Sequence, residues 1–245
     1  MVQIEVCANS VSSAIAAEEG GAIRVELCDN LYEGGTTPSA GQIELTRKNI
    51  GIQLYPIIRP RGGDFVYSDI EFEVMLQDIR HCRTLGCDGV VIGMLTRDGQ
   101  IDKQRAAMLV ESAYPMKVSF HRAFDMTVDM HQALEDIIDI GCERVLTSGG
   151  EANALDGADM IQKLIAQAGG RIEIMPGAGI RTHNVSQIIQ QTGATVFHAS
   201  AQTSVQSSMT YLNERLSMGA DTDEYVIKLT DANQVRDLIK NANSL

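Results

Sequence analysis

The sequence has no long apolar run and no excess of basic residues. No stretch approaches the roughly 18 apolar residues that a membrane-spanning helix needs, and the start, MVQIEVC, has neither the basic nor the apolar region of a signal peptide. Twenty basic residues against 32 acidic ones give a net charge of −12, which repels phosphate backbones and anionic lipids. We therefore expect a cytoplasmic protein with no membrane or nucleic-acid partner, and favour a small molecule or another protein as its partner.

Cysteine pairs of the kinds that hold small folds together are also missing. The chain has five cysteines, an odd number, and none of them has C-x-x-C spacing. Neither a disulfide framework nor a structural zinc site is indicated. We expect the five side chains to be reduced thiols.

What the sequence does contain is a recurring unit of helix, glycine and short apolar strand. The glycine is typical of a left-handed helix end, and a β-branched run follows it. Between the runs, apolar residues recur at about 3.6-residue spacing, as at Phe72, Met75, Leu76 and Ile79. The predicted strands lie within residues 2–8, 20–28, 49–59, 85–93, 116–122, 140–149, 168–177 and 192–200.

Eight such units in 245 residues predict an α/β fold, a single (β/α)8 TIM barrel of parallel strands formed by one domain over 1–245. A doubly wound open sheet is the alternative. The first turn, ANSVSSA (8–14), lacks the G-x-G-x-x-G pattern of a dinucleotide-binding sheet, so no nucleotide cofactor is indicated. Before the last helix, which Asp231 could cap, an extended segment at 201–230 breaks the repeat.

Charged and polar residues, two cysteines and several glycines gather at the carboxyl ends of the predicted strands, which is where TIM barrels keep their functional groups. We take them together as the candidate site. They are Glu5, Cys7, Glu26, Cys28, Arg59, Arg61, His121, Arg122, Asp125, Ser148, Gly149, Gly177, Gly179 and His198.

The first two strands repeat one pattern, IEVC (4–7) and VELC (25–28). Since side chains alternate between the faces of a strand, the glutamate and cysteine of each strand point the same way. Two carboxylates inside a barrel need partners, which Arg59, Arg61 and Arg122 could supply. A structural ion-pair layer and a pocket for a polar ligand both fit this pattern.

The same alternation brings Cys7 and Cys28 together. Thiolate ligands favour Cu(I) over harder ions, so a copper site is one interpretation. Buried cysteines also pack as small apolar side chains, which is the structural alternative.

Two glycine loops and two histidines indicate a different chemistry. SGG (148–150) and PGAGI (176–180) each stand between a strand and a helix, where backbone N–H groups attract anions, although tight turns alone also explain the glycines. His121 and His198 end strands and titrate near neutral pH. No Gly-x-Ser-x-Gly elbow or strand-centre lysine supports a serine hydrolase or a Schiff-base enzyme.

The enzyme hypothesis is therefore a barrel acting on a small anionic or phosphorylated metabolite. Arg59 and Arg61 would hold the anion with the glycine loops, and Glu26 and His121 would exchange protons. Asp125 or Glu5 would orient them. A barrel that serves as an interaction scaffold through residues 201–230 is a third possibility.

Several blocks of the sequence resemble the CutC copper-homeostasis family in their order along the chain. They are RVELC (24–28), EGGTTPS (33–39), PIIRPRGGDFVYSD (56–69), SFHRAFDM (119–126), RVLTSGG (144–150), GAGIR (177–181) and LSMGADTDEY (216–225). The resemblance implies a cytoplasmic (β/α)8 barrel that forms homo-oligomers, with a dimer as our expectation. It also implies copper handling, with Cys7 and Cys28 as the Cu(I) ligands. The charged residues of these blocks look more like an enzyme pocket, and both hypotheses stay open.

Overall fold

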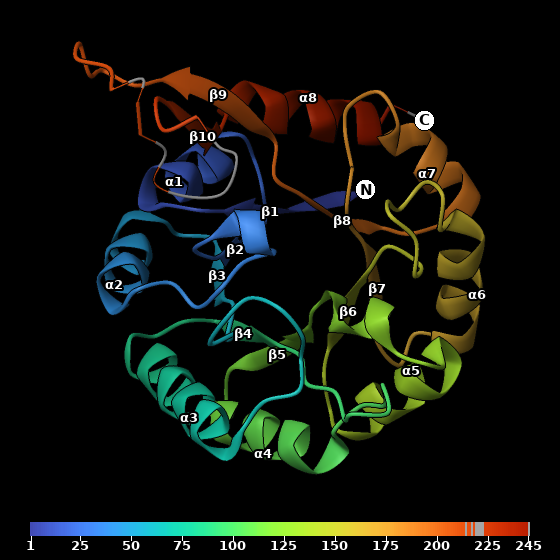
Figure 1. Cartoon of the computed structure of the whole chain (residues 1–245). Coiled ribbons are helices and arrows are strands. Elements are labelled where there is room, and N and C mark those ends of the chain that lie inside the picture. Colours follow the sequence, from blue (N-terminus) through green and yellow to red (C-terminus); the bar gives the residue numbers. More distant parts are fainter. Residues whose placement is uncertain (214, 217, 219–222, 245) are drawn as a thin grey trace.

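The computed structural model describes residues 1–213, 215, 216, 218 and 223–244. Parallel strands form an inner ring and helices surround it, as Figure 1 shows along the ring axis. The ring strands are β1 (Gln3–Ala8), β2 (Arg24–Leu27), β3 (Gln53–Pro56), β4 (Gly89–Ile92), β5 (Lys117–Phe120), β6 (Arg144–Thr147), β7 (Glu173–Pro176) and β8 (Val196–Ala199). The helices are α1 (Val11–Glu19), α2 (Ala40–Asn49), α3 (Asp69–Thr84), α4 (Lys103–Ala113), α5 (Met130–Asp139), α6 (Ala158–Ala168), α7 (Val185–Thr192) and α8 (Ala232–Ala242).

The strands pair in two parallel groups, β3-β2-β1-β8 and β4-β5-β6-β7. A parallel bridge between Ile57 and Val91 connects β3 to β4, and β7 lies beside β8 in Figure 1. The predicted TIM barrel is confirmed. No helix among the described residues is long and apolar enough to cross a membrane.

Local sequence signals set the ends of the helices. Ser68 caps α3 in a capping box, in which its side chain accepts from the Glu71 N–H and the Glu71 side chain accepts from the Ser68 N–H. Asp231 caps α8, as predicted, by accepting from two backbone N–H groups. Gly193 ends α7 with a φ of 72°, the left-handed conformation that favours glycine. The end of α7 at Gly193 lets β8 start at Val196, three residues later.

Strand side chains divide into two faces. Ile4 and Val6 of β1 belong to the main apolar core, which packs the strands against the helices, whereas Glu5 and Cys7 point into the barrel. Smaller apolar clusters fill the interior. One contains Cys7, Cys28, Tyr55, Ile57 and Val91, and another contains Leu146, Met175 and Val196. The glutamate and cysteine of each repeated pattern therefore share a face, as the alternation predicted, and the structure shows that this face is the inner one.

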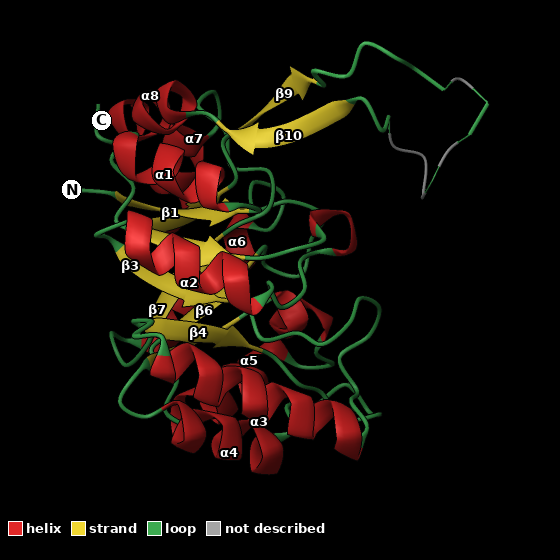
Figure 2. Ribbon diagram, turned by 90° about the vertical axis from the view of Figure 1, so that its left-hand side faces the viewer, coloured by secondary structure: helices red, strands yellow, loops and turns green. Residues whose placement is uncertain are grey.

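A hairpin interrupts the repeat before α8. Strands β9 (Gln202–Gln206) and β10 (Val226–Thr230) pair antiparallel and stand out from the barrel on the side to which β1 points (Figure 2). The N–H of Thr230 donates to Ser13 Oγ of α1 at 3.1 Å, which ties the base of the hairpin to the barrel. Only an extended segment was predicted at 201–230; these strands were not, and part of that segment lies outside the described residues.

Candidate functional site

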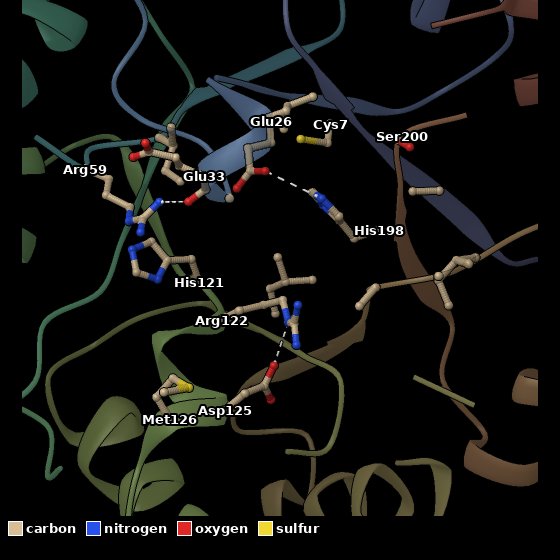
Figure 3. A pocket seen from close by; sticks show the side chains of 18 of the residues that line it. Cys7, Glu26, Glu33, Arg59, His121, Arg122, Asp125, Met126, His198 and Ser200 are labelled. Atoms are coloured by element: carbon tan, nitrogen blue, oxygen red, sulfur yellow. Dashed lines mark hydrogen bonds and ion pairs between the residues drawn. The ribbon is translucent and has the colours of Figure 1, made fainter. Parts of the chain in front are cut away.

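A cavity of about 410 Å³ opens at the carboxyl ends of the strands, and Figure 3 shows the side chains around it. Eight of the fourteen candidate residues line it, namely Cys7, Glu26, Arg59, His121, Arg122, Asp125, Gly179 and His198. The cavity is also lined by Glu33, Phe65, Met126 and Arg181, which were not among the predicted site residues. Phe65 and Arg181 lie on loops, whereas Glu33 ends a short 3-10 helix after β2 and Met126 ends one after β5. Residue spacing in the sequence does not show where a loop will run, so these four residues could not be placed at the cavity in advance.

A buried ion-pair layer supports the floor of this cavity. Glu5 of β1 lies opposite Arg24 of β2 and His198 of β8 in the strand registers. It accepts from Arg24 Nε and lies 2.7 Å from His198 Nδ1. Burial alone would raise the pKa of Glu5, but the bond from His198 and the charge of Arg24 lower it to about 2. The partner of Glu5 is thus Arg24, and the prediction that Arg59, Arg61 or Arg122 would pair with it is wrong.

Above this layer, three buried side chains could together hold a metal ion. Donor atoms of Cys7, Glu26 and His198 all lie within 4.8 Å of one another. Because His198 Nδ1 contacts Glu5, its Nε2 faces Glu26, whose Oε2 is 3.5 Å away. A carboxylate behind the imidazole commonly orients metal-binding histidines. Glu26 and His198 were predicted as strand-end site residues, but neither was predicted to be a ligand beside Cys7.

The second thiol adjoins this group. Cys28 Sγ is fully buried and lies 3.3 Å from Cys7 Sγ. It does not line the cavity itself, so it reaches the site only through Cys7. The two thiols that the sequence paired are therefore in contact.

The pKa values of Cys7, Glu26 and His198 are all raised from their ordinary values. The hydrogen bond with Cys28 and burial raise the pKa of Cys7 well above its ordinary value, and burial raises the pKa of Glu26. Burial opposes protonation of His198, but the charge of Glu26 and the bonds to Cys7 and Glu5 raise its pKa well above the ordinary value. Without a metal, the group holds neutral thiol and charged imidazolium, so a metal ion must displace protons to bind.

The two arginines after β3 lie in different places. Arg59 lines the cavity and is only 4% exposed. Arg61 does not line it, because its guanidinium forms ion pairs with Glu71 at 2.6 Å and Asp64 at 3.0 Å. Those two carboxylates neutralise Arg61, which was predicted to hold an anion in the pocket.

The glycine loop after β6 is occupied by Asp125. Its carboxylate accepts from the backbone N–H of Ser148 at 3.0 Å and of Gly150 at 3.3 Å, and from Arg122 Nε at 2.7 Å. Neither Ser148 nor Gly149 lines the cavity. The anion at this loop is therefore a side chain of the protein, and Asp125 fixes the loop beside the cavity.

The two glycines of the loop after β7 lie in different places, one outside the cavity lining and one in it. Gly177 does not line the cavity; a Cβ there would stand 2.5 Å from the Leu146 side chain, and its N–H donates to Thr147 O at 2.9 Å. Gly179 lines the cavity wall. Of the two glycines predicted here, only Gly179 is open to a ligand.

Comparison with known proteins places this arrangement in a family. The model of the CutC family matches residues 2–203. A CutC family protein from Chromobacterium violaceum is 52% identical over 236 residues, 96% of each chain. The human copper homeostasis protein cutC homolog is 49% identical, covering 96% of this chain and 87% of the relative.

A solved structure supports the same assignment. The CutC structure from Streptococcus agalactiae superposes with a TM-score of 0.78 at 34% identity, covering 82% of this chain and 99% of that one. The chain belongs to the CutC family, whose relatives are named for copper homeostasis.

Proposed function

We propose that this protein binds Cu(I) in copper handling, through Cys7 and Cys28 with His198 as a third ligand. The observation that carries the proposal is the contact between the two thiols, at 3.3 Å, with a His198 nitrogen within 4.8 Å of the Cys7 sulfur. Two sulfur donors and one imidazole form a soft set that suits Cu(I). The copper-homeostasis names of the relatives agree with this ion.

An anaerobic Cu(I) titration against a competing chelator tests this proposal. We expect Cys7→Ala/Cys28→Ala to weaken Cu(I) binding by at least about 100-fold, because it removes both sulfur ligands. Cys142→Ala is the matched control, since Cys142 is equally buried but lies before β6, away from the cavity. Unchanged affinity in the double variant would refute the site, and a preference for Zn²⁺ over Cu(I) would refute the choice of ion.

We also propose that the protein is cytoplasmic. All five cysteines are free, although Cys7 and Cys28 are close, which agrees with a reducing compartment. Cell fractionation tests this placement, and recovery from an oxidising compartment would contradict it.

We infer further that the protein forms a homodimer through β9, β10 and the described residues between them. Apolar side chains are exposed there on Val205, Met209, Tyr211, Leu212 and Ile227, and such a patch typically marks an interaction surface. We expect light scattering to show a dimer that Tyr211→Ser/Leu212→Ser shifts toward monomer. A monomeric wild-type protein would contradict this inference.

A further inference from the structure

The side of the cavity opposite the thiols carries two buried nitrogen donors without partners. Arg59 follows β3 and His121 follows β5, and each is 4% exposed. Arg59 Nε and His121 Nε2 have no hydrogen-bond partner among the described residues. Both side chains line the cavity and lie next to each other in Figure 3. Buried donors without a partner are rare and costly, and a bound ligand is one way to satisfy them.

The charge of Arg59 is also unbalanced. Its Nη1 donates to the backbone oxygens of Glu33 and Gly35 at 2.6 and 2.7 Å, and its Nη2 donates to Gly63 O at 2.9 Å. These carbonyls fix the guanidinium but carry no net charge. In the described part of the chain, no acidic side chain forms an ion pair with it. A buried cation without a counter-charge is unfavourable, so an anion entering the cavity would gain from this position.

His121 presents a neutral donor at the same place. Its Nδ1 accepts from the Ala123 N–H at 3.1 Å, which leaves the ring proton on Nε2. Burial and the charge of Arg59 lower the pKa of His121 to about 3, so the ring stays neutral near pH 7.

The packing around His121 fixes its orientation. The ring lies 5.1 Å from that of Phe65, between centroids. A Cβ on Gly93 would stand 2.2 Å from the imidazole, so only glycine leaves room for the ring there. The Nε2–H is therefore held in position before any ligand arrives.

From these observations we propose that Arg59 and His121 form a binding site for the carboxylate group of a small organic acid. One cation and two N–H donors match the charge and the two oxygens of a carboxylate. The cavity, at about 410 Å³, is in the size range of small-molecule sites. Phosphate is the weaker fit, because the N–H groups of the loop after β6 already bind Asp125. The site uses none of the proposed copper ligands and stands whether or not copper binds.

Calorimetric titration of the full-length protein with pyruvate, malonate and citrate tests the site, with inorganic phosphate as the competing anion. We expect at least one of the acids to bind and His121→Asn to weaken it by about 10- to 100-fold, the usual effect of losing one hydrogen bond to a charged group. Asparagine keeps an acceptor for the Ala123 N–H but removes the Nε2 donor. His121→Gln should restore much of the affinity, since its amide nitrogen reaches the Nε2 position.

Two further variants complete the test. Arg59→Lys keeps the charge but lacks Nε–H, and we expect it to weaken the same acid. His81→Asn is the matched control, because His81 is exposed on α3, and it should bind as the wild type does. The proposal is overturned if none of the three acids binds, if phosphate binds in their place, or if a bound acid retains its affinity in a folded His121→Asn variant.

Discussion

Replacing Arg24 by methionine is expected to lower the free energy of unfolding by about 3 to 5 kcal/mol, the usual cost of breaking a buried ion pair. Glu5 is 1% exposed and would keep only its bond from His198. Arg24 also donates to Gln53 Oε1 at 2.9 Å and lies over the Tyr55 ring, so the change removes packing inside the barrel as well. Urea unfolding measured near pH 7 gives the difference.

Two comparisons separate the buried charge from a general effect of losing a cation. Lys48→Met removes the exposed pair with Glu44 on α2 and should cost less than about 0.5 kcal/mol. Glu5→Gln combined with Arg24→Met should cost less than the sum of the single changes, because the double variant leaves no unpaired carboxylate. An Arg24→Met variant as stable as Lys48→Met would show that the ion-pair layer does not support the barrel.

His121 should make the protein sensitive to acid. Its pKa is lowered from 6.5 to about 3 in the folded protein, so the unfolded chain takes up a proton that the folded chain does not. The stability that this group contributes is fully present above about pH 6.5 and is lost as the pH falls from there toward about 3. Each pH unit is worth about 1.4 kcal/mol, so the wild type should lose roughly 3 kcal/mol from this group by about pH 4.

The His121→Asn variant lacks this titration. Its free energy of unfolding should therefore fall by less than that of the wild type between about pH 7 and pH 4, when both are measured by urea unfolding. His81→Asn, which changes an exposed histidine, should follow the wild type. Equal losses in all three proteins would mean that His121 is protonated in the folded state at acid pH.

The barrel and much of its cavity could be predicted because both depend on periodicity. Strand alternation predicted that Glu5 and Cys7 share one face of β1, and the structure shows that this face, like the one that carries Glu26, is the inner one. The partner of Glu5 could not be predicted in the same way, since Arg24 precedes Glu26 on the same strand and its reach depends on how β1 and β2 are staggered. Alternation gives the face of a side chain but not its neighbours across the barrel.

Loop residues show the limit of sequence spacing most clearly. Arg59 and Arg61 are two positions apart, yet one enters the cavity and the other pairs with Glu71 and Asp64. The glycines at 148–150 suggested a site for an external anion, but Asp125 reaches that loop from the end of β5. The hairpin was missed because both of its strands are largely exposed and carry no clear apolar alternation.

The cavity thus combines two chemistries on opposite walls. The wall formed by β1, β2 and β8 carries the Cys7 thiol, a carboxylate and an imidazole, whereas the wall formed by the ends of β3 and β5 carries a buried cation and a neutral donor (Figure 3). The first suits a soft metal ion and the second a carboxylate.

X-ray absorption at the copper edge of the Cu(I)-loaded protein tests the central claim, that copper binds through Cys7 and Cys28, most directly. We expect the wild-type spectrum to show two sulfur neighbours with a nitrogen neighbour from His198. Cys28→Ser should lose one sulfur. A spectrum with only nitrogen and oxygen neighbours, or one that Cys7→Ser/Cys28→Ser leaves unchanged, would contradict the claim.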